Sequence, residues 1–199
     1  MNFIETIEDL EALYGTPGEA SLVKVAKSMT PLYREWIAAS RFCLLSTAGA
    51  EGTDCSPRGD DRPVVMELDP NTLGLPDWRG NQRLDSLRNI VTDGRVSLAF
   101  MVPGNTNVVR VNGEARLSAD TALRSRFERR SILPTTVCVI KIHEIYIQCA
   151  RALMRSELWT SEHVALPSVG DLLREQSGGR IDGKSYDRAW PDRALKTMW

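Results

Sequence analysis

The sequence predicts a mainly β protein with added helices (α+β), built as an antiparallel barrel, and three observations support this. Between residues 42 and 149, short apolar runs alternate with turns that contain Gly, Pro, Asn or Asp, a pattern typical of consecutive antiparallel strands. These runs recur at roughly 8–12-residue spacing, which favours a sandwich or a barrel over alternating strand–helix–strand units. Helical periodicity is concentrated in the first forty residues.

Three helices are expected before the first strand. Residues 4–14 and 19–28 place apolar side chains at helical spacing, and a Gly- and Pro-containing turn separates the two segments. A third helix should begin with Thr30 as its N-cap and Pro31 as its first helical residue, and should end near Ser40.

The apolar runs predict six or seven strands, at residues 42–47, 55–68, 72–76, 96–102, 108–117 and 136–149. Gly113 interrupts one of these runs and indicates a bulge or a close backbone approach. Two helices are expected among the strands, at residues 81–91 and 119–130. Such strands fit a closed or split barrel, which leaves clefts at its rim and at a dimer seam.

Three segments are expected: N-terminal helices at 1–40, a barrel domain at 41–160, and a C-terminal arm or tail at 161–199. A short helix or extended arm is expected at 151–159. The end of the chain, from Ser177 to Trp199, is rich in Gly, Arg, Asp and Lys, and we expect it to have low order or to dock onto a partner.

Composition favours a soluble globular protein in a reducing compartment. The 199 residues are 42% hydrophobic and 26% charged, and the net charge of −1 gives no electrostatic support for nucleic-acid binding. None of the four cysteines forms a C-x-x-C pair, so free thiols are expected. The first residues lack the pattern of a signal peptide, and no apolar run approaches the ~18–20 residues of a membrane span. We expect a cytoplasmic protein with neither nucleic acid nor membrane as its partner.

Several classes of enzyme lack their motifs in this chain. The two histidines, His143 and His163, do not have the spacing of a zinc site, so no metal is expected. The G-x-S-x-G, G-x-G-x-x-G and Walker A motifs are absent. No catalytic residue can be assigned, and any enzymatic reaction is therefore expected to depend on a cofactor.

Three arginines are candidates for binding an anion. Arg83 follows Gly80 near the expected start of a helix, where free N–H groups and the helix dipole attract negative charge. Arg58 lies in Ser56-Pro57-Arg58-Gly59-Asp60, whose Pro and Gly indicate a break in regular strand pairing. Arg110 lies within a run of valines. The hypothesis is that all three surround one anionic ligand, most simply the phosphate of a flavin.

Each arginine also has a purely structural interpretation. Arg83 could point to solvent with Asp85 compensating its charge, and Arg58 could pair with Asp60 or Asp61 at a barrel corner. Arg110 could be an exposed strand residue.

Taken together, the motifs resemble the pyridoxamine 5′-phosphate oxidase-related, FMN-binding split-barrel family. The resemblance spans about residues 5–160 and depends on the order and number of its motifs. They are Ser56-Pro57-Arg58-Gly59-Asp60, Pro76-Asp77, Gly80-Asn81-x-Arg83-Leu84-Asp85-Ser86-Leu87-Arg88-Asn89-Ile90, Arg110-Val111-Asn112-Gly113 and Cys149-Ala150-x-Ala152-Leu153-x-Arg155-Ser156-x-Leu158-Trp159.

The resemblance implies a six-stranded antiparallel split β-barrel that forms a homodimer, with two FMN sites at the seam. It implies that Arg58 and the turn from Gly80 to Arg83 hold the phosphate. The segment from Arg155 to Trp159 would reach the flavin bound mainly by the other subunit. The candidate cofactor-binding residues are Ser56, Arg58, Gly59, Pro76, Asp77, Asn81, Arg83, Arg110, Arg155 and Trp159.

The implied function is that of an FMN-binding flavoprotein, an oxidoreductase acting on an unassigned small molecule. The C-terminal Arg-x-His of authentic pyridoxamine 5′-phosphate oxidases is missing, so oxidation of vitamin B6 is not implied. The alternatives are a non-catalytic flavin carrier or sensor, and a split barrel that uses deazaflavin or haem.

Overall fold

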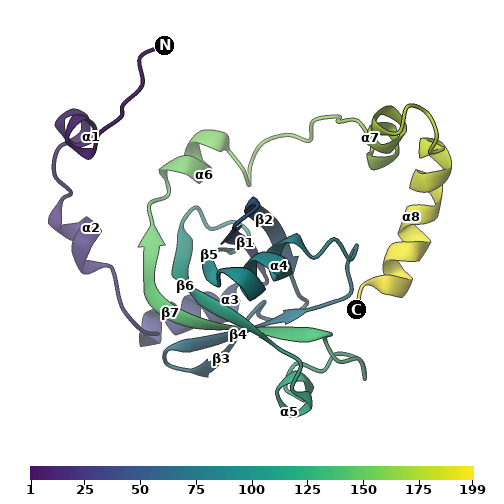
Figure 1. Ribbon diagram of the computed structural model, residues 1–199, viewed down its shortest axis with the longest axis horizontal. Coiled ribbons are helices and arrows are strands. Elements are labelled where there is room, and N and C mark those ends of the chain that lie inside the picture. Colours follow the sequence, from purple (N-terminus) through teal and green to yellow (C-terminus); the bar gives the residue numbers. More distant parts are fainter.

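A single seven-stranded antiparallel sheet forms the centre of the molecule in the computed structural model, which describes residues 1–199 (Figure 1). The strand order is β2-β1-β5-β6-β7-β4-β3, and the sheet curls without closing. The mixed α+β class and the split-barrel architecture agree with the expectation. The strands are β1 (Phe42–Gly49), β2 (Gly52–Gly59), β3 (Met66–Asp69), β4 (Thr72–Asp77), β5 (Arg95–Met101), β6 (Val108–Ser118) and β7 (Thr136–Gln148).

The sheet has one strand more than the six that the family resemblance implied. The run expected at 55–68 divides into β2 and β3, because the segment between them turns inward and buries Val64 and Val65. The run expected at 136–149 forms one continuous strand, β7.

The bulge expected at Gly113 is confirmed by a register shift between Asn112 and Gly113 where β6 pairs with β7. A Cβ atom on Gly113 would lie 2.0 Å from the carbonyl oxygen of Lys141. Only glycine allows the two backbones to approach this closely.

The core lies inside the curled sheet and follows from strand alternation. Along β1, Cys43 and Leu45 are buried while their neighbours are partly exposed, as a period of two requires. They join one hydrophobic cluster with residues such as Phe100, Val111 and Ile140 from the other strands. The helices α3 (Pro31–Ala39) and α4 (Asp85–Thr92) add Ile37 and Ile90 to this cluster.

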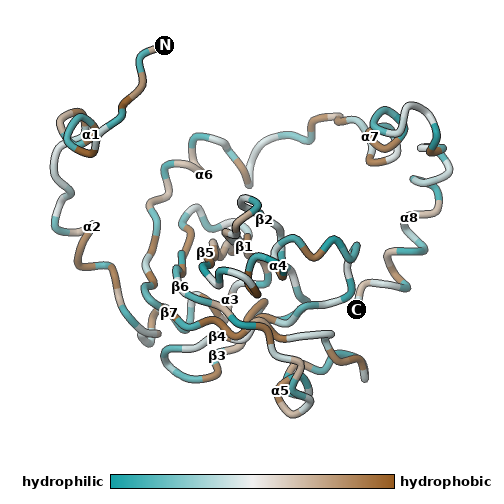
Figure 2. The backbone as a smooth tube through the Cα atoms, viewed as in Figure 1, coloured by the Kyte–Doolittle hydropathy of each residue, from teal (hydrophilic) through white to brown (hydrophobic).

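The N-terminal helices are as expected in order but shorter. They are α1 (Ile7–Tyr14), α2 (Glu19–Val23) and α3, whose N-cap Thr30 and first residue Pro31 match the sequence prediction. Neither α1 nor α2 buries any residue, and both lie away from the barrel (Figure 1). Figure 2 shows apolar residues along both helices.

Two expectations for the remaining helices were wrong. The helix expected at 119–130 is only α5 (Thr121–Ser125). The tail from Ser177, for which low order or docking onto a partner was expected, forms the helix α8 (Gly183–Thr197), so the expectation of low order was wrong. Before it come the short α6 (Arg151–Ser156) and α7 (Val169–Gln176). A capping box at Ser168 starts α7, and Asp182 caps α8; these local hydrogen bonds favour helices where composition alone suggested disorder. No helix is both long and apolar enough to cross a membrane.

Candidate functional site: a pocket at the open edge of the barrel

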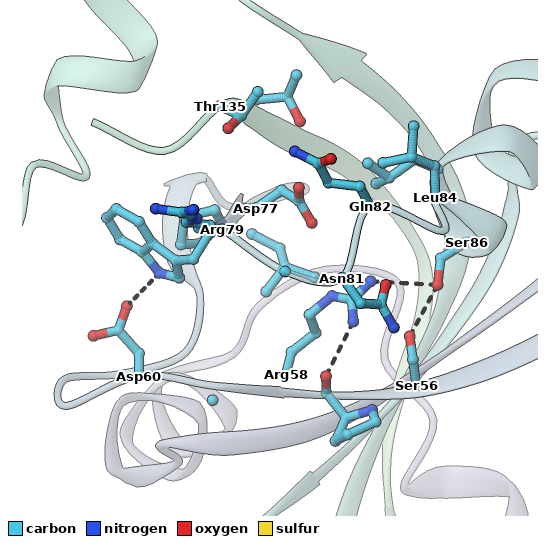
Figure 3. A pocket seen from close by; sticks show the side chains of 18 of the residues that line it. Ser56, Arg58, Asp60, Asp77, Arg79, Asn81, Gln82, Leu84, Ser86 and Thr135 are labelled. Atoms are coloured by element: carbon cyan, nitrogen blue, oxygen red, sulfur yellow. Dashed lines mark hydrogen bonds between the residues drawn. The ribbon is translucent and has the colours of Figure 1, made fainter. Parts of the chain in front are cut away.

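A pocket of about 1340 Å³ lies where β2, the end of β4 and the start of α4 meet (Figure 3). The start of β7 and the last two residues of the chain complete its wall. Its volume exceeds the roughly 300–1,000 Å³ of a typical small-molecule site, so it has room for a cofactor and a second ligand.

Seven of the ten predicted site residues line this pocket, although they come from three separate stretches of the chain. They are Ser56, Arg58, Gly59, Pro76, Asp77, Asn81 and Arg83. The sheet order explains how they meet. β2 stands at one edge, β4 lies next to the other edge, and the curl of the sheet brings the two together.

Arg58 is a cation without a carboxylate partner. Its guanidinium group donates to the Pro57 carbonyl (3.0 Å) and to the Ser86 hydroxyl (3.3 Å) (Figure 3). The alternative pairing with Asp60 or Asp61 does not occur. The nearly buried Arg129 takes both carboxylates instead, at 3.2 and 3.6 Å.

A chain of hydroxyl groups continues from Arg58 towards α4. Ser86, in the first turn of α4, donates its proton to Asp54. Since that proton is used, Ser56 must be the donor in its 2.9 Å contact with Ser86. Sequence analysis did not single out Ser86 or Asp54; the available signal was a serine just inside the helix that follows Asn81-x-Arg83.

The start of α4 adds free backbone donors to the pocket. Arg88 is the first residue of the helix whose N–H bonds back to a carbonyl, that of Leu84 at 2.8 Å. The N–H groups of Asp85, Ser86 and Leu87 therefore have no partner within the helix, and these three residues line the pocket.

Arg83 was expected in the first turn of the helix, but it lies before the helix starts. Leu84 has a positive φ of 64° and Gln82 one of 62°, so the helix starts only at Asp85. The Arg83 side chain is 74% exposed and bonds Asp85 at 2.8 Å, which is the structural interpretation considered for it. Asn81 accepts a hydrogen bond from the Arg83 backbone N–H at 3.1 Å.

The floor of the pocket combines a half-buried acid with an unsatisfied hydroxyl. Burial raises the pKa of Asp77, and the positive charge of Arg58 offsets part of that rise. Opposite Asp77 in the β4–β7 register lies Thr136, whose hydroxyl oxygen is buried without a hydrogen-bond partner. A buried polar atom of this kind is rare and often marks a place for a ligand or water.

Two tryptophans form the far end of the pocket, and sequence analysis singled out neither as part of it. The rings of Trp78 and Trp199 meet edge to face with centroids 5.1 Å apart. The Trp78 indole N–H donates to Asp60 at 3.1 Å. Asp60 thus bonds both Trp78 and Arg129, and these bonds fix the position of the Trp78 ring.

Three predicted residues lie outside the pocket of their own chain. The Arg110 guanidinium lies 5.3 Å from the centroid of the Tyr146 ring. Trp159 donates to the Asn105 carbonyl at 2.8 Å, and Arg155 is exposed on α6. Their expected contact with a flavin in a second copy of the chain stays a prediction.

No cluster of three His, Cys, Asp or Glu side chains that could hold a metal ion is present. Both histidines are exposed, His143 on β7 and His163 in the loop after α6.

A comparison with models of protein families identifies the family of this chain. The family model for pyridoxamine 5′-phosphate oxidase matches residues 29–149, more than half of the chain. The chain therefore belongs to the pyridoxamine 5′-phosphate oxidase family. The matched range contains the whole sheet and the pocket residues except for the two at the C-terminus.

Solved structures also match the chain at low sequence identity. A HupZ protein of Group A Streptococcus is 18% identical with a TM-score of 0.50, over 60% of this chain and 98% of that one. General Stress Protein 26 from Bacillus anthracis is 19% identical over 57% and 88% of the two chains, with a TM-score of 0.42. An FMN-binding protein from Syntrophomonas wolfei is 12% identical over 71% and 95%, with a TM-score of 0.43. No curated protein matches the chain.

Proposed function

We propose that the pocket binds FMN and that the chain is an FMN-dependent oxidoreductase acting on a small molecule. The observation that carries the proposal is Arg58, a cation in the pocket wall with no carboxylate partner. It stands beside two serine hydroxyls and the free N–H groups at the start of α4. This combination of donors suits a phosphate group.

The residues present fit the phosphate end of a flavin mononucleotide. Arg58 keeps donors that its two bonds do not use, and the free N–H groups of Asp85, Ser86 and Leu87 add uncharged ones. Asp54 is an unfavourable neighbour, because its carboxylate takes the Ser86 proton. A phosphate would gain that proton only if the Ser86 hydroxyl turned away from Asp54.

The remainder of the pocket fits a planar ring system. Val64, Leu75 and Pro76 supply apolar wall, and Gly59 leaves the β2 backbone open to close approach. A bound flavin would supply the hydride chemistry. The protein would orient the ring and exclude water, and the Asp77 carboxyl, whose pKa is raised by burial, lies at the pocket floor.

An FMN titration tests the proposal. Purified protein should acquire the visible absorbance of bound flavin, and Arg58→Ala should weaken FMN binding by about tenfold to a hundredfold, the effect of losing one charge-assisted contact. Arg116→Ala is the matched control, since Arg116 is exposed on β6 and does not line the pocket. Equal affinities for the two variants, or no binding at all, would contradict the proposal.

A non-catalytic flavin carrier is the second candidate function. It is favoured by the absence of a histidine or cysteine from the pocket lining, which leaves Asp77 as the acidic group with a raised pKa there. Turnover of NADH or NADPH with an acceptor, faster than with free FMN, would identify an enzyme. A bound flavin without such turnover, across a panel of acceptors, would favour the carrier.

A further inference from the structure

The C-terminal helices return the end of the chain to the pocket. α7 and α8 pack against each other as a hairpin, and Figure 1 shows α8 beside the barrel with its C-terminal end nearest. Asp187 of α8 accepts hydrogen bonds from the Gly170 N–H and the Ser168 hydroxyl of α7, at 2.8 and 2.6 Å. Gly170 and Gly183 meet so closely that a Cβ atom on either would lie about 2 Å from a carbonyl oxygen of the other.

The hairpin is thus a preformed unit, and its contact with the pocket is made by its last residues. Met198 and Trp199 line the pocket. Trp199 packs edge to face on Trp78, and Arg130 lies 5.8 Å from the Trp199 ring. Leu195 and Trp190, on the same helix, are largely exposed.

In the contact between Trp78 and Trp199, the Trp78 ring is held in place, whereas Trp199 is held by few contacts. Trp78 is held by Asp60, whose carboxylate is buried and bonded to Arg129. Trp199 is held by ring contacts alone, because its indole N–H is buried without a hydrogen-bond partner. An element secured by few contacts opens more readily than the core to which it docks.

We propose that Trp199 is a movable wall of the pocket: docked on Trp78 it narrows the entrance and admits small ligands, and its release with α8 opens the route to the pocket floor. The inference rests on the proposed function in one respect, that this pocket is the ligand site. Trp199 would then limit the size of the second ligand beside the cofactor.

Thiol labelling at the pocket floor tests this wall without any cofactor. Thr136→Cys, in a background with Cys55→Ser and Cys149→Ser, places a reactive group at the floor. Burial raises the thiol pKa of both Cys43 and Cys138 to about 12, so these two cysteines should stay unreactive. The probe is a bulky fluorescein maleimide, with iodoacetamide as the small counterpart.

Adding Trp199→Ala should speed maleimide labelling by at least about tenfold, because the contact that limits opening is lost. Iodoacetamide labelling should change much less. Trp190→Ala is the matched control, since Trp190 stacks on Tyr186 and does not line the pocket. Trp199→Phe keeps an aromatic edge and should restore slow labelling.

Equal maleimide rates in all these variants would overturn the inference, as would an equal acceleration by Trp190→Ala. The result is independent of FMN. A shift in labelling without FMN binding would support the movable wall and reject the proposed cofactor, whereas FMN binding with unchanged labelling would do the opposite.

Discussion

At the scale of single residues, Arg58 lacks a carboxylate partner because a different arginine, Arg129, binds the nearby Asp60. The sequence places Arg58 two residues before Asp60, which makes an ion pair between them a reasonable expectation. Arg129, nearly seventy positions away, takes Asp60 instead. Nothing local in the sequence identifies that pairing, because it depends on how the turn after α5 packs beneath the β2–β3 loop.

The same residue scale yields a prediction for Asp77. Its pKa is raised in the folded protein above the ordinary value of 3.8, so between these two pKa values the folded state binds more protons than the unfolded state. The contribution of Asp77 to stability should therefore fall as pH rises through this window. Asp77→Asn removes the dependence.

Thermal unfolding of wild type and Asp77→Asn from pH 3 to pH 8 measures this effect. The melting temperature of the variant, relative to wild type, should increase as pH rises and then level off. A difference that is constant with pH would show that Asp77 has an ordinary pKa.

At the scale of elements, periodicity predicted which strands and helices form, but it did not predict correctly where several of them begin and end. The apolar runs located the strands, because alternation directly reflects one buried face. The start of α4 was misplaced, since positive φ angles at Gln82 and Leu84 are set by the pocket loop and not by helix propensity. Asp187 explains the missed hairpin, because it joins α7 to α8 through contacts between the helices.

Gly113 supports a prediction at this scale. A methyl group there would collide with the Lys141 carbonyl, which belongs to the backbone of β7 and cannot move aside. Gly113→Ala should reduce the free energy of unfolding by about 1–3 kcal/mol, measured by urea denaturation. Gly80→Ala is the matched control, because a Cβ atom on Gly80 meets nothing within 4 Å. Equal effects of the two substitutions would contradict the steric reason.

At the scale of the whole molecule, apolar surface remains uncovered. Ile7, Leu10 and Leu13 of α1 are exposed, as are Val164 and Leu166 after α6. Exposed apolar side chains suit a partner interface, and on this ground we propose that the chain forms the homodimer that the family resemblance implied. Such a dimer would also give Arg155 and Trp159, which lie outside the pocket of their own chain, a partner site to contact.

Light scattering after gel filtration should therefore give twice the 22.2 kDa of one chain. Trp159→Ala should weaken FMN binding without changing that mass, if Trp159 reaches the flavin of the other copy. A monomer with full FMN affinity would contradict this proposal.

The sequence by itself determined the fold class, the family resemblance and seven residues that share one pocket. It could do so because strand alternation and short motifs are local properties of the chain. The tertiary structure decided which charges remain free, that Ser86 and Thr136 belong to the pocket, and that Trp199 ends in its wall. These depend on contacts between segments far apart in the sequence, and only the curl of the sheet and the return of α8 bring those segments together.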